Sequence, residues 1–407
     1  MRLSQYSNAT NCSDQTLRST SVPEGYFLAH IALTAYDLET GGISRVAVYL
    51  ANSFVDLGHK VSLLLCTSAG NLDEMLRSKL RDAVNIVDFG NKVYASRILG
   101  QMRTFHSYRK WLKANQPDAV LGTSNNISWF TGLGAIALGG RAPDFYIKTT
   151  NPIVRKVGGP FKTAFRKWGY DKLFSKAQAV LTLCKSESRI MEHAFPEHTG
   201  LFRAVYNPYL TEDFLRKNPA ESQPATRRAA PVLFTAGRLE SQKNLQRMIQ
   251  AFALAKRKDD MAGTDHLRDA KLKIAGEGSQ RKELEQLIDE LGQNETIELL
   301  GFRDDVADLM TSADMFVLSS NYEGLPAVVI EALGSCIAVV TTDCFAAARE
   351  LIGGLPGCAV TEMSPEALAE GIYQSLQNRS SNEILRERAA NYSIASAAES
   401  HLSAMGL

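Results

Sequence analysis

The sequence predicts an α/β protein made of two doubly wound parallel-sheet domains, and three observations lead to this fold class. The chain has 407 residues, which is long for one domain and natural for two. Short apolar runs alternate with segments of helical periodicity, as in a parallel sheet covered by helices on both faces. The alternation starts again at residue 232, after a segment with three prolines, so a second domain is expected there.

The first domain is expected to span residues 24–207, after a polar leader at 1–23 that reads as disordered. A strand at 26–33, a helix that ends at Gly58 and a strand at 61–65 form one right-handed βαβ unit. Further strands of this domain are predicted at 84–87, 119–121, 144–148 and 179–183.

The second domain is expected to span residues 208–385, with its boundary near Tyr206-Asn207-Pro208. Apolar residues at helical spacing predict one helix over 245–253 and another over 284–291. Strands are predicted at 232–236, 272–275, 297–300, 315–318 and 338–341.

The most informative segment is SNYEGLPAVVIEALGS, residues 320–335, which reads as a loop and a helix after the strand at 315–318. Pro326 suits the first helical position, because the amide hydrogen that it lacks is unpaired there. Glu323 then lies at the carboxyl end of the strand, where open parallel sheets bind ligands. The helix N-terminus favours an anion, and the two carboxylates of Glu323 and Glu331 can hold hydroxyls.

These residues resemble the two-glutamate signature of retaining nucleotide-sugar glycosyltransferases with the GT-B fold, closest to family 4. The resemblance implies two Rossmann-like domains facing a cleft, with a last helix, here 386–407, that packs back on the first domain. It covers the C-terminal half well, and the N-terminal half only through a glycine pair and the strand–helix pattern. Four further segments match in the family's order: Gly41-Gly42, Gly237-Arg238-Leu239 with Gln242-Lys243-Asn244, Ala275-Gly276-Glu277-Gly278, and Leu300-Gly301-Phe302.

The resemblance implies catalytic roles for Glu323, Arg238 and Lys243. Arg238 and Lys243 would hold the donor diphosphate and stabilise the charge that develops on it. Glu323 would contact the donor sugar, either by holding its hydroxyls or by stabilising positive charge at the anomeric carbon. The alternatives are an exposed basic loop for the two cations and a loop cap for Glu323.

Glu331 would accept both ribose hydroxyls of the donor. In a helix of otherwise apolar residues, a buried glutamate also requires a partner. Phe302 and Arg303 would border the nucleobase, although Phe302 could instead belong to the core. The remaining expected donor-binding residues are Gly41, Gly42, Gly237, Gly276, Gly324, Leu325 and Pro326.

No metal or other cofactor is expected. The sequence shows no acidic pair or histidine cluster with metal-ligand spacing, and the resemblance implies metal-independent transfer from a donor that is most simply UDP- or GDP-linked. The chain departs from the family at one point. Many members place a histidine in the N-terminal domain facing the sugar, where this chain has Thr149-Thr150-Asn151-Pro152.

The net charge of +1 conceals an asymmetry. Residues 1–205 hold 25 Lys and Arg against 15 Asp and Glu, whereas residues 206–407 hold 20 against 29. The basic half could meet a charged partner, or the two halves could attract each other across the cleft. Basic residues with interleaved aromatics at 94–113 and 155–176 suit an anionic membrane. The predicted docking residues are Arg109, Lys110, Trp111, Lys162, Arg166, Lys167 and Trp168.

Two other interpretations of these basic segments remain. Nucleic acid is the rival partner, but no nucleic-acid motif supports it. Alternatively the aromatics are core residues and the bases a solvated face. No signal peptide, membrane-spanning run or C-x-x-C pair is evident, which favours a cytoplasmic protein peripheral to the inner membrane face.

The expected activity is transfer of a sugar, with retention, to a lipid-linked or glycolipid acceptor in cell-surface polysaccharide or glycolipid synthesis. A GT-B enzyme with a soluble acceptor, or a sugar epimerase, is one alternative. A nucleotide-sugar-binding protein without catalysis is another.

Overall fold

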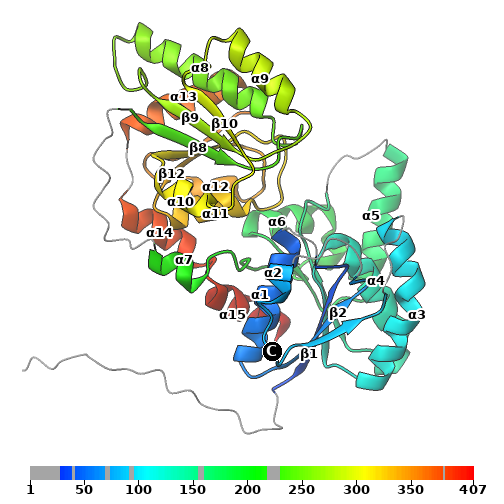
Figure 1. Ribbon diagram of the computed structural model, residues 1–407. Helices are drawn as coiled ribbons and strands as arrows, with labels where there is room; N and C mark the ends of the chain where they lie inside the picture. The colour runs from blue at the N-terminus through cyan, green and yellow to red at the C-terminus, as the bar shows by residue number, and fades with distance from the viewer. Residues whose placement is uncertain are drawn as a thin grey trace, which may run out of the picture.

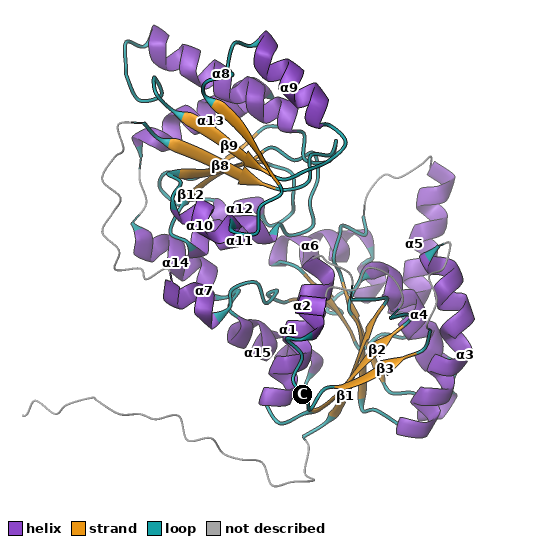
Figure 2. Ribbon diagram, in the orientation of Figure 1, coloured by secondary structure: helices purple, strands orange, loops and turns teal. Residues whose placement is uncertain are grey.

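The computed structural model describes residues 28–38, 42–68, 74–90, 96–154, 160–217, 230–378 and 381–407. The predicted leader at 1–23 and Gly41 lie outside these residues. Figure 1 shows two α/β domains, one coloured blue to green and one green to orange, with the chain passing between them twice. Figure 2 shows in each domain a sheet flanked by helices, as the sequence predicts.

The N-terminal sheet has seven parallel strands in the order β3-β2-β1-β4-β5-β6-β7. All six residues of β1 are buried, since helices cover both faces. The strands are β1 His30–Ala35, β2 Lys60–Leu65, β3 Asn85–Asp88, β4 Ala119–Gly122, β5 Asp144–Lys148, β6 Ala179–Thr182 and β7 Phe202–Ala204.

The helices of this domain fall largely between the strands, as the alternating pattern predicts. Gly58, with φ of +89°, follows the end of α1, in a conformation that glycine adopts without strain. The helices are α1 Gly42–Asp56, α2 Glu74–Arg77, α3 Arg97–Asn115, α4 Asn125–Ile136, η1 Gly139–Arg141, α5 Pro160–Phe174, α6 Lys185–Ala194 and η2 Pro196–His198.

The C-terminal sheet has six parallel strands in the order β10-β9-β8-β11-β12-β13. The strands are β8 Val232–Ala236, β9 Lys271–Ala275, β10 Ile297–Gly301, β11 Met315–Leu318, β12 Ala338–Thr342 and β13 Ala359–Thr361. The helices of the C-terminal half and of the crossings are α7 Glu212–Lys217, α8 Leu245–Met261, α9 Arg281–Glu290, α10 Val306–Thr311, α11 Ala327–Gly334, α12 Ala348–Ile352, α13 Pro365–Gln377, α14 Asn382–Ala390 and α15 Ile394–Met405.

Strand order reverses once in each sheet, between β1 and β4 and between β8 and β11. Ligands of open α/β sheets bind at such switch points, beyond the carboxyl ends of the strands. In the C-terminal sheet, the two segments that leave this point are residues 237–244, here called the β8 loop, and residues 319–326, the β11 loop. They contain the predicted cations and Glu323.

The two crossings between the domains lie side by side. The backbone N–H groups of Tyr209 and Leu210 donate to the carbonyl of Tyr392 at 3.0 Å, and Ile394 donates back to Leu210 at 3.1 Å. Before this point α14 packs on α11, and after it α15 packs on α1 and β6. The helix that returns to the N-terminal domain is therefore α15. Within the described ranges, none of the helices has the length and apolar character needed to span a membrane.

Candidate active site

The β8 and β11 loops are hydrogen-bonded to each other. The backbone N–H of Asn321 donates to the carbonyl of Gln242 at 2.8 Å, and Ser319 Oγ donates to the carbonyl of Lys243 at 3.0 Å. Arg247 in the first turn of α8 donates to the carbonyl of Ser319 at 2.8 Å. These bonds fix the two loops relative to each other at the switch point.

The fixed loops bring Glu323 and Lys243 together. Lys243 Nζ donates to Glu323 Oε1 at 2.8 Å, and Ser320 Oγ donates to the same oxygen at 2.7 Å. Glu323 is 8% exposed, and a carboxylate buried to this degree requires such partners. Side chains hold this carboxylate, whereas a loop cap would accept from backbone N–H groups of its own loop. The arrangement therefore favours a role in binding over a role in capping.

Three glycines let the ends of β8, β9 and β10 approach closely. Gly276 has φ of +143° and its N–H donates to the carbonyl of Gly301 at 2.7 Å. A Cβ at Gly276 would lie 1.9 Å from the carbonyl oxygen of Gly237, so a larger residue cannot fit. A Cβ at Gly237 would lie 3.2 Å from Lys243 Cε. The glycines thus leave room for the Lys243 side chain above the strand ends.

Arg238, Phe302 and Arg303 lie exposed around these strand ends. The backbone carbonyl of Arg238 accepts from the N–H of Glu240 at 2.8 Å, but its guanidinium has no hydrogen-bond or ion-pair partner among the described residues and can bind an anion. Phe302 is 80% exposed, so it is not the core residue that the sequence left as an alternative. Arg303 Nε donates to Asp305 Oδ1 at 2.7 Å. An exposed phenyl ring here can stack on a planar ligand.

The start of α11 differs by one residue from the prediction. Pro326 is the N-cap, with extended ψ of 112°, and the helix begins at Ala327. Its missing amide hydrogen is harmless at this position too. Leu325 is buried, and its carbonyl accepts from the hydroxyl of Tyr209 at 3.1 Å.

Glu331 has the partner that its helix required, and the sequence did not identify it. Arg45 of α1 donates from Nη2 to Glu331 Oε1 at 2.8 Å, across the boundary between the domains. Burial disfavours the charged guanidinium, but the carboxylate of Glu331 outweighs this effect and raises the pKa of Arg45. Arg45 is the only basic residue in α1, and this was the only feature of the sequence that could have pointed to it as the partner of Glu331.

The β11 loop also meets the loop that follows β5, where the family's histidine is absent. A Cβ at Gly324 would lie 2.1 Å from the carbonyl oxygen of Thr150. Asn125 holds this loop, because its Oδ1 accepts from the N–H of Thr150 at 2.8 Å and its Nδ2 donates to the carbonyl of Asn151 at 2.7 Å. The residues that stand in place of the histidine therefore contact the β11 loop, which contains Glu323, through their backbone.

A third contact between the domains joins Glu350 of α12 to the N-terminus of α6. Its carboxylate accepts from the N–H and the hydroxyl of Ser186 at 3.0 and 3.1 Å. The N–H of Lys185 donates to it at 3.3 Å. A carboxylate at a helix N-terminus complements the helix dipole. With Arg45–Glu331 and Gly324–Thr150, it holds the carboxyl ends of the two sheets facing each other.

Comparison with known proteins agrees with this geometry. The profile described as Glycosyl transferases group 1 matches residues 218–392, and the profile described as Glycosyltransferase Family 4 matches residues 40–212. Between them they span most of the chain, one on each domain. The chain is a group 1 glycosyltransferase of the GT-B fold.

Two relatives of the glycosyltransferase come from Campylobacter jejuni. The N-acetylgalactosamine-N,N'-diacetylbacillosaminyl-diphospho-undecaprenol 4-alpha-N-acetylgalactosaminyltransferase is 28% identical over 242 residues, or 60% of this chain and 61% of the relative. The GalNAc-alpha-(1->4)-GalNAc-alpha-(1->3)-diNAcBac-PP-undecaprenol alpha-1,4-N-acetyl-D-galactosaminyltransferase is 25% identical over 340 residues, or 79% of this chain and 82% of the relative.

The fold is shared with solved structures of low sequence identity. Anabaena HepE in complex with UDP and glucose superposes with a TM-score of 0.66 at 16% identity, covering 93% of this chain and 99% of HepE.

The predicted docking residues of the glycosyltransferase divide into two groups. Trp111 packs edge-on against His30, with ring centroids 5.9 Å apart, and Arg109 Nη2 donates to the carbonyl of Ala137 at 2.9 Å. Lys110, Lys162, Lys167 and Trp168 are exposed and Arg166 is half-buried. Trp111 is thus partly buried against the core, whereas four of the other predicted docking residues are exposed.

Exposed apolar side chains lie near these bases, and two of them, Ile98 and Met102, were not identified from the sequence. Ile98 and Met102 of α3 are 71% and 72% exposed, and Phe165 of α5 is 67% exposed beside Trp168 at 57%. Figure 1 shows α3, α4 and α5 on the same side of the N-terminal sheet. In this group α3 contacts α4, and the ring of Trp129 in α4 would lie 2.7 Å from a Cβ at Gly169 in α5.

A cluster of three buried polar side chains lies where α15 packs on the N-terminal sheet. Lys148, at the end of β5, is fully buried, and burial lowers the pKa of its ammonium to about 7 although Glu187 opposes the shift. Burial raises the pKa of Glu187, which accepts from Thr149 Oγ1 at 3.0 Å. His401 of α15 is buried beside them, and burial with the charge of Lys148 lowers its pKa well below the ordinary value.

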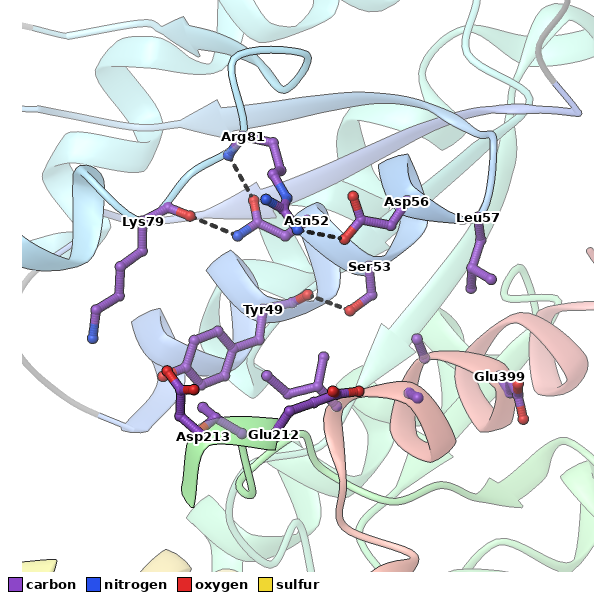
Figure 3. Close-up of a pocket in the computed structure, with 14 residues that line it drawn as sticks. Tyr49, Asn52, Ser53, Asp56, Leu57, Lys79, Arg81, Glu212, Asp213 and Glu399 are labelled. Atoms are coloured by element: carbon purple, nitrogen blue, oxygen red, sulfur yellow. Dashed lines mark hydrogen bonds and ion pairs between the residues drawn. The ribbon is translucent and has the colours of Figure 1, made fainter. Parts of the chain in front are cut away.

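A cavity of about 700 Å³ lies between α1, α7 and α15 (Figure 3). Lys79 and Arg81 line one wall, where Arg81 pairs with Asp56 at 3.1 Å, and Glu212 and Glu399 line the other. The α7 and α15 residues adjoin the two crossings. The cavity thus lies beside the crossings, and none of the predicted donor-binding residues lines it.

The part of the chain that the structure describes contains no group of three or more His, Cys, Asp or Glu side chains able to hold a metal ion. Gly42 is exposed at the start of α1, next to Gly41, which is outside the described residues.

Proposed function

We propose that this glycosyltransferase moves a sugar from a nucleotide diphosphate donor to a lipid-linked or glycolipid acceptor, with retention of configuration. The observation that carries the proposal is the pairing of Lys243 with Glu323 at 2.8 Å, at the switch point of the C-terminal sheet. Sugar transfer needs a cation for the departing diphosphate and a carboxylate for the sugar, and the two loops supply both at one place.

The cations and the glycines would act on the leaving group. Cleavage of the bond between the anomeric carbon and the diphosphate leaves negative charge on the phosphate oxygens. Lys243 and the exposed Arg238 can meet this charge, one as a compact ammonium and the other as a planar fork. Gly237 and Gly276 allow the phosphates to approach the strand ends. These groups neutralise the diphosphate without a metal ion in this proposal.

Glu323 would face the sugar as the leaving group departs. Its bonds to Lys243 and Ser320 hold the carboxylate in a fixed position before any ligand arrives. Two roles fit this position: accepting hydrogen bonds from sugar hydroxyls, or stabilising positive charge at the anomeric carbon. Glu331 would take the ribose hydroxyls, and the exposed ring of Phe302 would stack on the base.

The acceptor and the donor base are inferred from relatives. Both Campylobacter relatives are named for undecaprenol-linked acceptors, and HepE was solved with UDP. A UDP-linked donor is the first choice and a GDP-linked donor the second. The exposed apolar residues and bases of α3 and α5 suit an anionic membrane that carries such an acceptor. We therefore propose that the enzyme works at the inner membrane face.

Transfer of label from UDP- or GDP-sugars to a polyprenol or glycolipid extract tests the proposal, with the anomeric configuration of the product read by NMR. Wild type should give lipid-bound sugar with the donor's configuration. Glu323→Gln should lower turnover at least a hundredfold, whereas Glu370→Gln, in an exposed pair with Lys258, should not.

Other results of the same assay would favour the alternatives. Labelling of a soluble acceptor without lipid would favour a soluble-acceptor enzyme, and a change in the sugar without transfer would favour an epimerase. Tight donor binding with neither transfer nor hydrolysis would favour a non-catalytic protein. Inverted product would contradict retention.

A further inference from the structure

Arg45 lies on the face of the N-terminal domain that is turned toward the proposed donor site. It lies in the first turn of α1, the first helix after β1, and β1 borders the switch point of its sheet. From there its guanidinium reaches Glu331 of the other domain, 286 residues later in the chain, at 2.8 Å. Glu331 is the carboxylate expected to hold the donor ribose. Arg45 therefore stands where a donor would lie.

The guanidinium of Arg45 has unused binding capacity. It carries five N–H donors in a planar fork, and its Nε is buried without a hydrogen-bond partner among the described residues. The side chain is 34% exposed and that of Glu331 is 16% exposed. A half-buried ion pair of this kind contributes little to stability, because desolvation of both charges offsets their attraction. A purely structural role accounts poorly for such a residue.

The two carboxylates of the site are held in the same way. Lys243 Nζ lies 2.8 Å from Glu323, and Arg45 Nη2 lies 2.8 Å from Glu331. The four charges cancel when no donor is bound. A nucleotide diphosphate sugar brings hydroxyls, which carboxylates accept, and a diphosphate, which cations bind. Each ion pair can thus separate when the donor binds, because the carboxylate then accepts from donor hydroxyls and the cation binds the diphosphate.

We propose that Arg45 is a donor-binding residue that leaves Glu331 for the diphosphate when ribose hydroxyls reach that carboxylate. The inference rests on the proposed function. Arg238 and Lys243 belong to the C-terminal domain and Arg45 to the N-terminal domain. The diphosphate is then held by cations of both domains, and donor binding draws the domains together.

Titration of wild type and variants with UDP, UMP and uridine, or with the guanosine series if GDP is the nucleotide bound, tests this assignment. Arg45→Met should weaken diphosphate binding at least tenfold, weaken monophosphate binding less and leave nucleoside binding unchanged. Arg45→Lys should recover part of the loss, since it restores charge without the fork. Arg81→Met, in an exposed pair with Asp56, is the matched control and should bind as wild type.

The double variant Arg45→Met/Glu331→Gln separates direct binding from repulsion by an uncompensated Glu331. Weakened diphosphate binding in the double variant supports the inference. Recovery to the level of Glu331→Gln alone, or wild-type or tighter binding by Arg45→Met, overturns it, because Arg45 would then only neutralise or block Glu331. If the proposed function itself is wrong, wild type will bind no nucleoside diphosphate, and this result is distinct from those that overturn the role of Arg45.

Discussion

Gly324 shows how closely the two domains approach at a single residue. Its φ is outside the left-handed region, so alanine is acceptable to the backbone, but a Cβ would lie 2.1 Å from the carbonyl oxygen of Thr150. The neighbour is backbone held by Asn125 and cannot turn away as a side chain could. A substitution at Gly324 therefore disturbs the contact between the domains and not the fold of either domain.

Gly324→Ala should push the β11 loop away from Thr150 and lower kcat/KM at least tenfold, with little change in the thermal unfolding of the protein. Gly140→Ala is the control, since a Cβ there meets nothing within 4 Å. Steady-state kinetics and calorimetry on both variants would check this. Wild-type kinetics for Gly324→Ala would mean that this contact is absent during turnover.

Glu331 marks the limit of what the sequence could predict about the site. An acidic residue in an apolar helix showed that a partner was required. The identity of that partner depends on how two domains pack, and Arg45 is 286 residues away. The ring of Phe302 shows the same limit, because local sequence did not decide between core and surface.

Among the elements, α15 is attached to the N-terminal sheet through polar groups that have no access to water. Tyr146 donates from its hydroxyl to the carbonyl of Met405 at 2.6 Å, and His401 lies buried near Lys148 and Glu187. His401 Nδ1 is 2.7 Å from the carbonyl of Ala397, so this nitrogen carries the proton of the neutral ring. Neutral His401 is the form that suits the buried site.

The pKa of His401 makes the folded state sensitive to acid. Its folded pKa lies well below the unfolded value of 6.5, so as the pH falls through 6.5 the unfolded chain binds a proton that the folded chain does not. The free energy of unfolding then decreases by up to about 1.4 kcal/mol per pH unit. His401→Gln should flatten the decline between pH 6.5 and 5 in urea titrations.

His106→Gln, at an exposed position on α3, is the control for this prediction and should keep the wild-type slope. Equal slopes for wild type and His401→Gln would contradict a buried neutral imidazole.

The α3 and α5 helices make a separate prediction about membranes. Phe165→Ser with Trp168→Ser should reduce binding to vesicles containing anionic lipid at least fivefold, because both rings are exposed beside Lys162 and Lys167. Vesicle sedimentation measures this. Met261→Ser, which removes an 89% exposed side chain from the other domain, is the control. Equal sedimentation of the double variant and wild type would remove these helices from the docking surface.

The sequence predicted most elements because apolar runs and helical spacing follow directly from burial. All the predicted strands of the C-terminal domain are present, and the strands at 144–148, 232–236 and 315–318 have the predicted ends. It missed β7 and β13, which have three residues each and are too short to form a pattern. It also placed Pro326 inside α11, since proline suits the N-cap and the first turn alike.

For the whole molecule, two switch points face each other because the chain crosses between the domains in two adjacent segments. The hydrogen bonds of Tyr209, Leu210 and Ile394 tie these segments together, so the two crossings form one connection between the domains. Polar contacts then join the facing strand ends at Arg45–Glu331 and at Glu350–Ser186. The sequence predicted the two domains and their cleft, but contacts between distant segments carry no local pattern.

The donor site proposed at the β8 and β11 loops can be tested by thermal unfolding with UDP, GDP, ADP and TDP and their sugars. A ligand that binds only the folded state stabilises it by about 2.7 kcal/mol at a hundred times its Kd. One nucleotide family should raise the Tm of wild type by several degrees, and Arg238→Met should abolish the rise. If no nucleotide raises the Tm even with lipid extract present, or if Arg238→Met responds as wild type does, the donor site does not lie at the β8 and β11 loops.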